Sequence, residues 1–223
     1  MNALENSIEI IQAYLPLFIS GAQYTLKLAF VVVILSIPLG ALLALMRLSS
    51  NRLLKSIARG YIEIIRGTPL LVQVYLVYFG LPMLGYTGIS DFWSAVLAIT
   101  VNSTAYMGEI MRSGIQSVDS GQTEAARALG LPSHITFTKI VFPQAIKNIL
   151  PAIGNEFAVL IKETSIVSVL GITDLMFASD QVRGATYTTF TPLLFTAGIY
   201  FVMVFTISQL MNAFEGRLKK ADR

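Results

Sequence analysis

Polar side chains recur at helical spacing within an apolar stretch over residues 92–111. Asn102, Tyr106 and Glu109 occupy positions i, i+4 and i+7, so a helix would carry them on one face, with Ser103 at its border. A carboxylate in hydrocarbon is costly unless it is paired or hydrated. This face predicts either a water-filled path for a polar solute or polar packing between helices, with Glu109 bonded to Arg112 or to the backbone of the loop that follows.

A second polar cluster lies in the apolar stretch 149–161. Asn155 and Glu156 are adjacent there, and Pro151 and Gly154 are expected to interrupt the helix. Irregular backbone at membrane depth is tolerated where it lines a cavity, so Asn155 and Glu156 are expected to share a cavity with the first cluster.

The charge of this cavity predicts its substrate. The sequence places no Lys or Arg in the middle of the stretches that carry the two clusters. An acidic cavity favours a cationic amino acid over a dicarboxylate. Asn102, Ser103 and Asn155 offer the amide and hydroxyl donors that the carboxylate of such a substrate needs.

The sequence lacks the residue sets that catalysis would require. His134 is the only histidine, there is no cysteine, and no G-x-x-x-x-G-K-[ST] phosphate loop occurs. We therefore expect no enzyme, no cofactor and no metal site, and any ATP hydrolysis would belong to a separate chain.

The composition is that of a multi-pass membrane protein. Charged residues make up 13% of the chain, about half the usual share of a soluble domain. We predict an all-α membrane domain over residues 1–223 with about five transmembrane helices. The predicted spans are residues 21–46, 61–81, 92–111, 149–161 and 192–214.

Three local features complete the expected helices. Residues 4–18 are amphipathic, which fits either an interfacial helix or the first turns of span one. Glu63 and Arg66 can pair three residues apart, and Pro69 is expected to interrupt span two early. Residues 162–191 read as an irregular segment with a short apolar piece at 166–172.

The loop between spans three and four, residues 119–143, has a helical signature. Asp119 is a candidate N-cap, Gly130 is placed to end the first helix, and Pro132 prevents its continuation. A second helix of roughly two turns is expected from Ser133 toward Ile140, before Pro143. A compact polar helical loop in a membrane protein indicates a docking site.

The sequence Glu124-Ala125-Ala126, with Gly130 and the later Pro143, resembles the EAA loop of ATP-binding-cassette importer permeases. Further motifs resemble the polar amino-acid branch of that family: Arg66-Gly67-Thr68-Pro69, Ala105-Tyr106 with Glu109-Ile110 and Arg112, and Lys162-Glu163-Thr164-Ser165. Two positions depart from the family pattern. Phe142 precedes Pro143 where Leu is usual, and Ser113 replaces a second Gly.

The resemblance implies residue roles and partners. It assigns Glu124, Ala125, Ala126 and Gly130 to a cytoplasmic coupling helix that inserts into an ATPase subunit. It further implies a homo- or heterodimer of permeases, two ATPase subunits and an extracytoplasmic solute-binding protein.

The distribution of basic residues predicts the orientation independently. The loops after spans one and three, and the chain after span five, hold nearly all of the Lys and Arg residues. The positive-inside rule therefore places the EAA loop and the C-terminus in the cytoplasm and the N-terminus outside a bacterial inner membrane.

Three functional interpretations remain open. The first is the membrane subunit of an ATP-driven importer of a polar, basic amino acid, with glutamine or acidic specificity as a variant. The second is an ion-coupled secondary transporter that uses Glu109 and Glu156, although such proteins usually have more spans and internal repeats. The third is a scaffold or channel subunit, which would tolerate loss of these polar residues.

Overall fold

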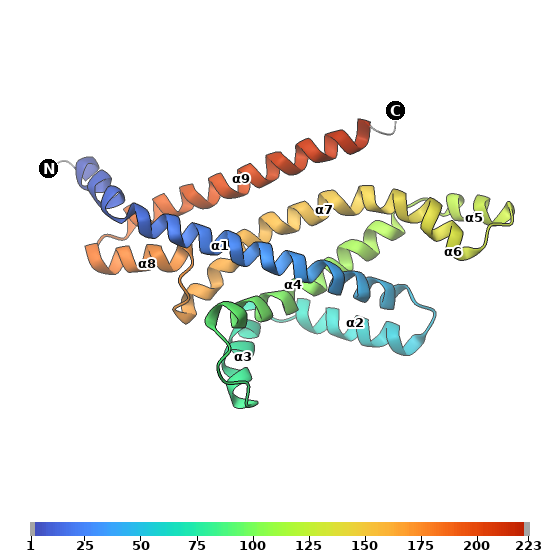
Figure 1. The fold of residues 1–223 in the computed structure, drawn as a ribbon, viewed down its shortest axis with the longest axis horizontal. Helices are drawn as coiled ribbons and strands as arrows, with labels where there is room; N and C mark the ends of the chain where they lie inside the picture. Colours follow the sequence, from blue (N-terminus) through green and yellow to red (C-terminus); the bar gives the residue numbers. More distant parts are fainter. Residues whose placement is uncertain (1–2, 221–223) are drawn as a thin grey trace. The chain divides into compact units, whose positions relative to one another are not determined.

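The computed structural model describes residues 3–220, and the side chains of residues 5–216. All regular structure in the described part is helical, which confirms the all-α class (Figure 1). The elements are α1 (Ala3–Leu48), α2 (Arg52–Arg66), α3 (Leu70–Met83), α4 (Asp91–Gln116), α5 (Ser120–Ala128), α6 (Ser133–Thr136), the π-helix η1 (Phe137–Val141), α7 (Phe142–Glu163), the 3-10 helix η2 (Thr164–Leu170), α8 (Leu175–Thr186) and α9 (Phe190–Lys220).

The chain forms two compact units, each assembled from three separate stretches. The first unit contains Met1–Ile34, Pro69–Thr100 and Phe157–Ile207, and the second contains Leu35–Thr68, Val101–Glu156 and Ser208–Arg223. The long helices α1, α4, α7 and α9 contribute residues to both units.

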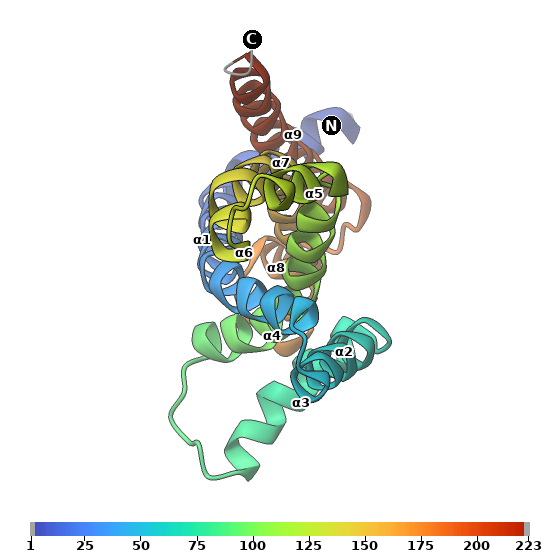
Figure 2. The same ribbon diagram turned by 90° about the vertical axis from the view of Figure 1, so that its right-hand side faces the viewer.

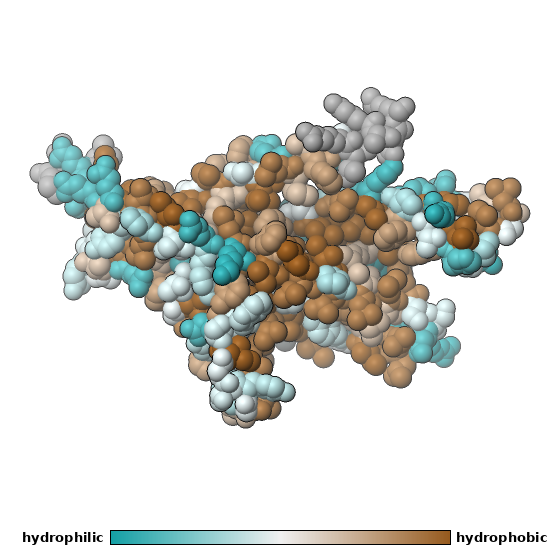
Figure 3. Space-filling view, viewed as in Figure 1, coloured by the Kyte–Doolittle hydropathy of each residue, from teal (hydrophilic) through white to brown (hydrophobic). Residues whose placement is uncertain are grey.

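Length and hydropathy identify the membrane-spanning elements. Two described helices, Glu5–Leu48 and Phe190–Gly216, are individually long and apolar enough to cross a membrane, and α2 with α3 forms a third, broken candidate. The helices α4 and α7 have 26 and 22 residues, enough to cross about 30 Å of hydrocarbon. Their polar residues lower their hydropathy. The face shown in Figure 3 is largely apolar, and hydrophilic residues lie near the N-terminal end of α1 and around α5 and α6, among other places.

The N-terminal residues form part of α1. The helix runs without interruption from Ala3 to Leu48, so residues 4–18 are its first turns and do not form a separate interfacial helix. The basic residues Arg217, Lys219, Lys220 and Arg223 lie outside the described side chains.

The predicted span two is divided at Pro69. Arg52–Arg66 and Leu70–Met83 meet at an angle of 104°, and Pro69 is the N-cap of the second helix. Proline lacks the N–H that a continuing helix would use, which explains the position of the break. The expected pair of Glu63 and Arg66 is not formed, because Glu63 accepts a 2.7 Å hydrogen bond from Arg59.

Close helix approach organises the second unit. A Cβ atom built on Gly40 of α1 would lie 2.5 Å from Met107 Cβ and 2.9 Å from the Gly108 backbone nitrogen of α4. Helices in lipid associate through such small residues, because the hydrophobic effect does not drive them together there. Leu43, Ala58, Ile62 and Ala105 form a buried cluster beside this contact.

Residues 162–191 are more regular than the sequence indicates. The helix η2 ends at Gly171, whose φ of +79° suits glycine, and α8 begins after Asp174. The Asp174 carboxylate caps α8 by accepting from the Phe177 N–H at 2.9 Å, and the Leu175 N–H donates to Thr25 of α1 at 3.2 Å.

Candidate functional site

A pocket of about 390 Å³ lies in the second unit. Side chains from α2, α4 and α7 line it. The residues are Arg66 from α2, Tyr106, Glu109, Ile110, Ser113, Gly114 and Ser117 from the end of α4 and the residue after it, and Asn148 and Ala152 from α7. Polar and charged groups therefore face a space that is large enough for a small polar solute.

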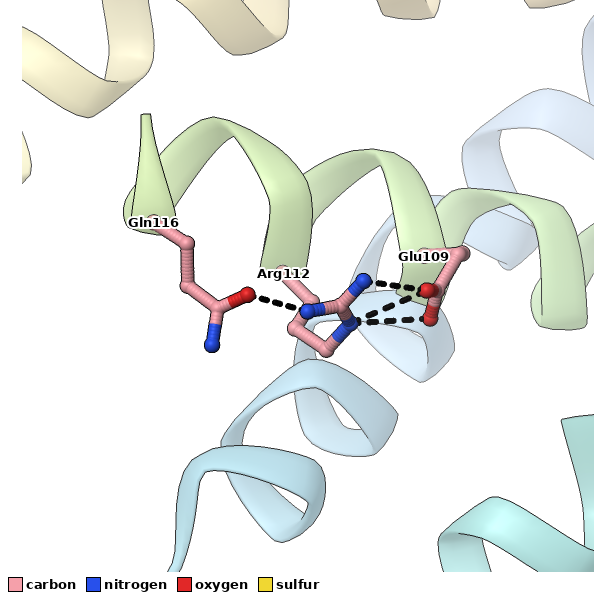
Figure 4. A network of polar contacts seen from close by, with 3 residues as sticks. All are labelled: Glu109, Arg112 and Gln116. Carbon is pink, nitrogen blue, oxygen red and sulfur yellow. Dashed lines mark hydrogen bonds and ion pairs between the residues drawn. The ribbon is translucent and has the colours of Figure 1, made fainter. Parts of the chain in front are cut away.

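The lining residue Glu109 belongs to an ionic network on α4 with Arg112 and Gln116 (Figure 4). The Nε of Arg112 donates to both Glu109 carboxylate oxygens at 3.0 Å, and the guanidinium also bonds to Gln116. Both charged side chains are mostly shielded, with exposed fractions of 23% for Arg112 and 24% for Glu109. The local pair that the sequence offered as an alternative for Glu109 is therefore present, and it compensates the charge of this carboxylate.

The contact between α4 and α7 sets their register. Asn148 donates to the hydroxyl of Ser117 at 2.9 Å, and Gly114 leaves room for Ile149. Asn148, Ala152 and Glu156 are four residues apart, so they share one face of α7. Glu156 consequently lies one helical turn, about 6 Å, beyond Ala152 at the edge of the pocket.

The predicted substrate residues occupy different environments. Tyr106 and Glu109 line the pocket. Asn102, Ser103 and Glu156 are buried, with exposed fractions of 4%, 0% and 8%, and are not part of the pocket lining. Asn155 is exposed, although it is adjacent to Glu156.

Two predictions about α7 and the pocket are wrong. The helix continues from Phe142 to Glu163 through Pro151 and Gly154, so the expected break is absent. The pocket is also not purely acidic, because the end of α2 brings Arg66 into it. Arg66 and Asn148 were not predicted as pocket residues. The sequence suggested Glu63 as the partner of Arg66, and Asn148 precedes the predicted span 149–161. Asn148 precedes Glu156 by eight residues, or two steps of four. This spacing could have predicted that both residues lie on one helix face.

The EAA loop begins with a capped helix. The Asp119 carboxylate accepts from the Gly121 N–H at 2.7 Å, as its N-cap role predicts. At the other end, Gly130 N–H donates to Arg127 O and Leu131 N–H to Ala126 O, the two bonds of a Schellman motif. Gly130 has a φ of +81°, which explains the requirement for glycine.

The loop residues assigned to the coupling helix divide into two groups by exposure. Glu124, Ala125 and Gly130 are exposed, whereas Ala126 is 3% exposed and faces the rest of the loop. The helix α5 packs against α6 and η1, and the two views show this hairpin from the side and end-on (Figures 1 and 2). The exposed residues present a small, sterically open surface.

The second loop helix is not a separate helix of roughly two turns, so that prediction is wrong. Helix α6 starts at Ser133 as expected, but it continues through η1 directly into α7. The loop hairpin is thus joined to a membrane helix by continuous helical backbone. Among residues 5–216, no group of three or more His, Asp or Glu side chains is arranged to hold a metal ion.

Comparisons with known proteins place this fold among transport proteins. Residues 36–220 match the family described as binding-protein-dependent transport system inner membrane component. The arginine transport system permease ArtQ of Bacillus subtilis is 43% identical over 93% of this chain and 95% of its own length. The nopaline transport system permease NocM of Agrobacterium fabrum is 40% identical over 92% of this chain and 88% of its own.

Solved structures agree with this assignment. A crystal structure of an amino acid ABC transporter with histidines superposes with a TM-score of 0.88 at 50% identity, over 93% of this chain and 96% of that chain. An inward-facing MetNI methionine transporter, at 19% identity and a TM-score of 0.76, shares the fold. The chain belongs to the family of inner-membrane components of binding-protein-dependent transport systems.

Proposed function

We propose that this chain is the membrane subunit of an ATP-driven importer and that it carries a basic amino acid. The observation that carries the class is the match of residues 36–220 to the permease family, together with 43% identity to a permease named for arginine. Family membership disfavours the ion-coupled and scaffold interpretations.

The buried carboxylate of Glu156 supports a cationic substrate. It is 8% exposed and lies on the α7 face that carries the lining residues Asn148 and Ala152, one turn beyond Ala152. Glu156 is therefore the carboxylate that we assign to the side chain of the substrate. Asn102, Ser103, Tyr106 and Asn155 are assigned to the remainder of the path.

Glutamine is the second candidate substrate. Permeases from Rickettsia conorii and other Rickettsia species, described as putative glutamine transport proteins, are about as similar to this chain, with 40% identity in the first case. A neutral amide side chain would not need a carboxylate at position 156.

The proposed assembly contains two permeases, two ATPase subunits and a solute-binding protein. The ATPase contacts Glu124, Ala125, Ala126 and Gly130 in the EAA loop. The continuous helix through α6, η1 and α7 supports this role, because it would transmit movement of the loop to the pocket-lining face. The N-terminus lies outside and the C-terminus in the cytoplasm.

The substrate assignment is tested by uptake with the variant Glu156→Gln. Arginine, lysine, histidine, glutamine and glutamate are supplied to proteoliposomes that contain the complete transport system. We expect the wild type to prefer the cationic set, and the variant to lose at least about tenfold in that preference, as for loss of one charge-assisted hydrogen bond. The isosteric Glu9→Gln variant, at an exposed position of α1, is the matched control. An unchanged arginine preference in Glu156→Gln would refute the role of Glu156, and wild-type uptake of glutamine alone would select the second candidate.

A further inference from the structure

Arg66 lines the pocket, and its guanidinium group makes no ion pair within the described residues. Its carbon lies 5.3 Å from the centre of the Tyr106 ring, a cation–π distance that fixes the side chain on one side of the pocket. Glu63, the carboxylate nearest in sequence, is bonded to Arg59. Over residues 5–216, Arg66 has no ion pair and no side-chain hydrogen bond, so its planar N–H donors are available to a ligand.

The charges around the pocket favour an anionic group. Glu109 is the one carboxylate among the lining residues, and it is bonded to Arg112. Arg47 of α1 and Arg66 also lie close enough for their charges to act on Glu109. Arg66 and Glu109 are the charged residues in the pocket lining, and Glu109 is bonded to Arg112, so Arg66 is the lining charge without an ion-pair partner among residues 5–216.

The neighbouring Glu109 limits which anionic ligands can bind beside Arg66. A carboxylate has about four lone-pair sites, and the Arg112 bonds leave acceptor capacity on Glu109. A group with two negative charges would be repelled by Glu109. A zwitterion, in contrast, brings a carboxylate for Arg66 and an ammonium group for Glu109, and an arginine fork matches a carboxylate in two parallel hydrogen bonds.

We propose that Arg66 binds the α-carboxylate of the transported amino acid, and that Glu109 receives its α-ammonium group. This inference rests on the proposed function, and it replaces the amide and hydroxyl donors that the sequence suggested for the carboxylate. On α7, Glu156 lies one turn beyond the lining residue Ala152, on the same helix face. A substrate held by its head group at Arg66 and Glu109 can therefore direct its side chain toward Glu156. The head group is common to all amino acids, so the role of Arg66 does not depend on which side chain is carried.

The test compares an amino acid with its own carboxamide. The permease–ATPase complex is placed in nanodiscs without the solute-binding protein, because that protein would select ligands by itself. The labelled amino acid that the wild-type system imports is displaced either by the unlabelled acid or by its α-carboxamide, which keeps the side chain and the ammonium group. The variants are Arg66→Gln and Arg66→Lys. The matched control is Arg59→Gln on the same helix. Arg59 pairs with Glu63, and the two side chains are 65% and 62% exposed.

The proposal predicts that substitution of Arg66 lowers both the affinity for the amino acid and the preference for the acid over its α-carboxamide. We expect Arg66→Gln to weaken binding of the acid by about 10- to 100-fold and binding of the carboxamide by less than about threefold, as for loss of a charged hydrogen bond. Arg66→Lys keeps the charge but not the fork, so its affinity for the acid falls between those of the wild type and Arg66→Gln. The Arg59→Gln variant behaves as the wild type.

Two results would overturn the proposal while leaving the proposed function intact. One is an Arg66→Gln variant that retains the wild-type preference for the acid over the carboxamide. The other is an equal loss of both ligands, which indicates a structural role for Arg66. A wild-type system that imports no amino acid would overturn the proposed function, and this inference with it.

Discussion

Single small residues determine how closely the helices of the second unit approach. At Gly40, an added Cβ would meet backbone and Cβ atoms of Met107 and Gly108 at 2.5–2.9 Å, and none of these atoms can move without shifting α4. At Gly154, the atoms that an added Cβ would meet belong to the flexible side chain of Met211. Gly40 is therefore needed for the close approach of α1 and α4, whereas the space beside Gly154 is filled by a side chain that can move.

This difference predicts unequal costs of the same substitution. We expect Gly40→Ala to reduce the free energy of unfolding by about 1–3 kcal/mol through overpacking, and Gly154→Ala to have a smaller effect because Met211 can adopt another rotamer. Gly198→Ala, where no atom lies within 4 Å of an added Cβ, is the control. Thermal unfolding of the purified protein in one detergent measures all three, and equal melting temperatures for Gly40→Ala and Gly198→Ala would contradict the packing account.

The charged residues show where inference from spacing succeeds and where it stops. The pair of Glu109 and Arg112, three residues apart on one helix, was available from the sequence and is observed. For Glu63 the sequence predicted Arg66 as the partner, three residues on, whereas the structure pairs it with Arg59, four residues before it. Spacing alone cannot decide between such partners. The contact of Arg66 with Tyr106 joins two helices, so no local pattern predicts it.

At the scale of elements, two prolines differ in their effect on the helix: Pro69 interrupts it, and Pro143 does not. Pro69 divides α2 from α3 as predicted, because the missing N–H falls where the chain bends by 104°. Pro143 does not end a helix, because it follows the π-helix η1, where the i to i−4 bonding pattern is already interrupted. The π-helix therefore lets the chain continue as a helix without the hydrogen bond that Pro143 cannot donate. Helix propensities do not predict where a π-helix occurs.

The turn at the end of α5 gives a prediction for coupling. Gly130→Val forces a β-branched residue to a φ of +81°, so we expect the loop to lose its shape while the protein remains in the membrane. Gly130→Asn is the matched variant, because asparagine tolerates this conformation better. Co-purification of the ATPase with membrane-extracted protein is the measurement. Wild-type recovery of the ATPase with Gly130→Val would show that the turn does not shape the docking surface.

At the scale of the molecule, the two compact units alternate along the chain. The second unit takes Leu35–Thr68, Val101–Glu156 and Ser208–Arg223, so the chain leaves and re-enters each unit. Hydropathy and helix signals locate individual helices, but the grouping depends on contacts between residues far apart in sequence. The all-α class was therefore predictable, whereas this division, and the parts of α2 and α7 that line the pocket of the second unit, were not.

The positive-inside rule gives a whole-molecule prediction of orientation. Because the chain contains no cysteine, single cysteines report their own accessibility. We expect Thr87→Cys, between α3 and α4, to react with a membrane-impermeant thiol reagent added to intact cells, and Ser50→Cys, between α1 and α2, to react only after permeabilisation. Both residues are exposed in the structure. The opposite labelling pattern would reverse the proposed topology.

The central claim is that this chain moves an amino acid by using ATP hydrolysed in a partner subunit. It is tested most directly by uptake into proteoliposomes that contain the chain, its ATPase and its solute-binding protein, with ATP or an ion gradient as the only energy source. We predict uptake that requires ATP and the binding protein and that persists when ion gradients are collapsed. Uptake driven by an ion gradient without ATP would contradict the account and support a secondary transporter.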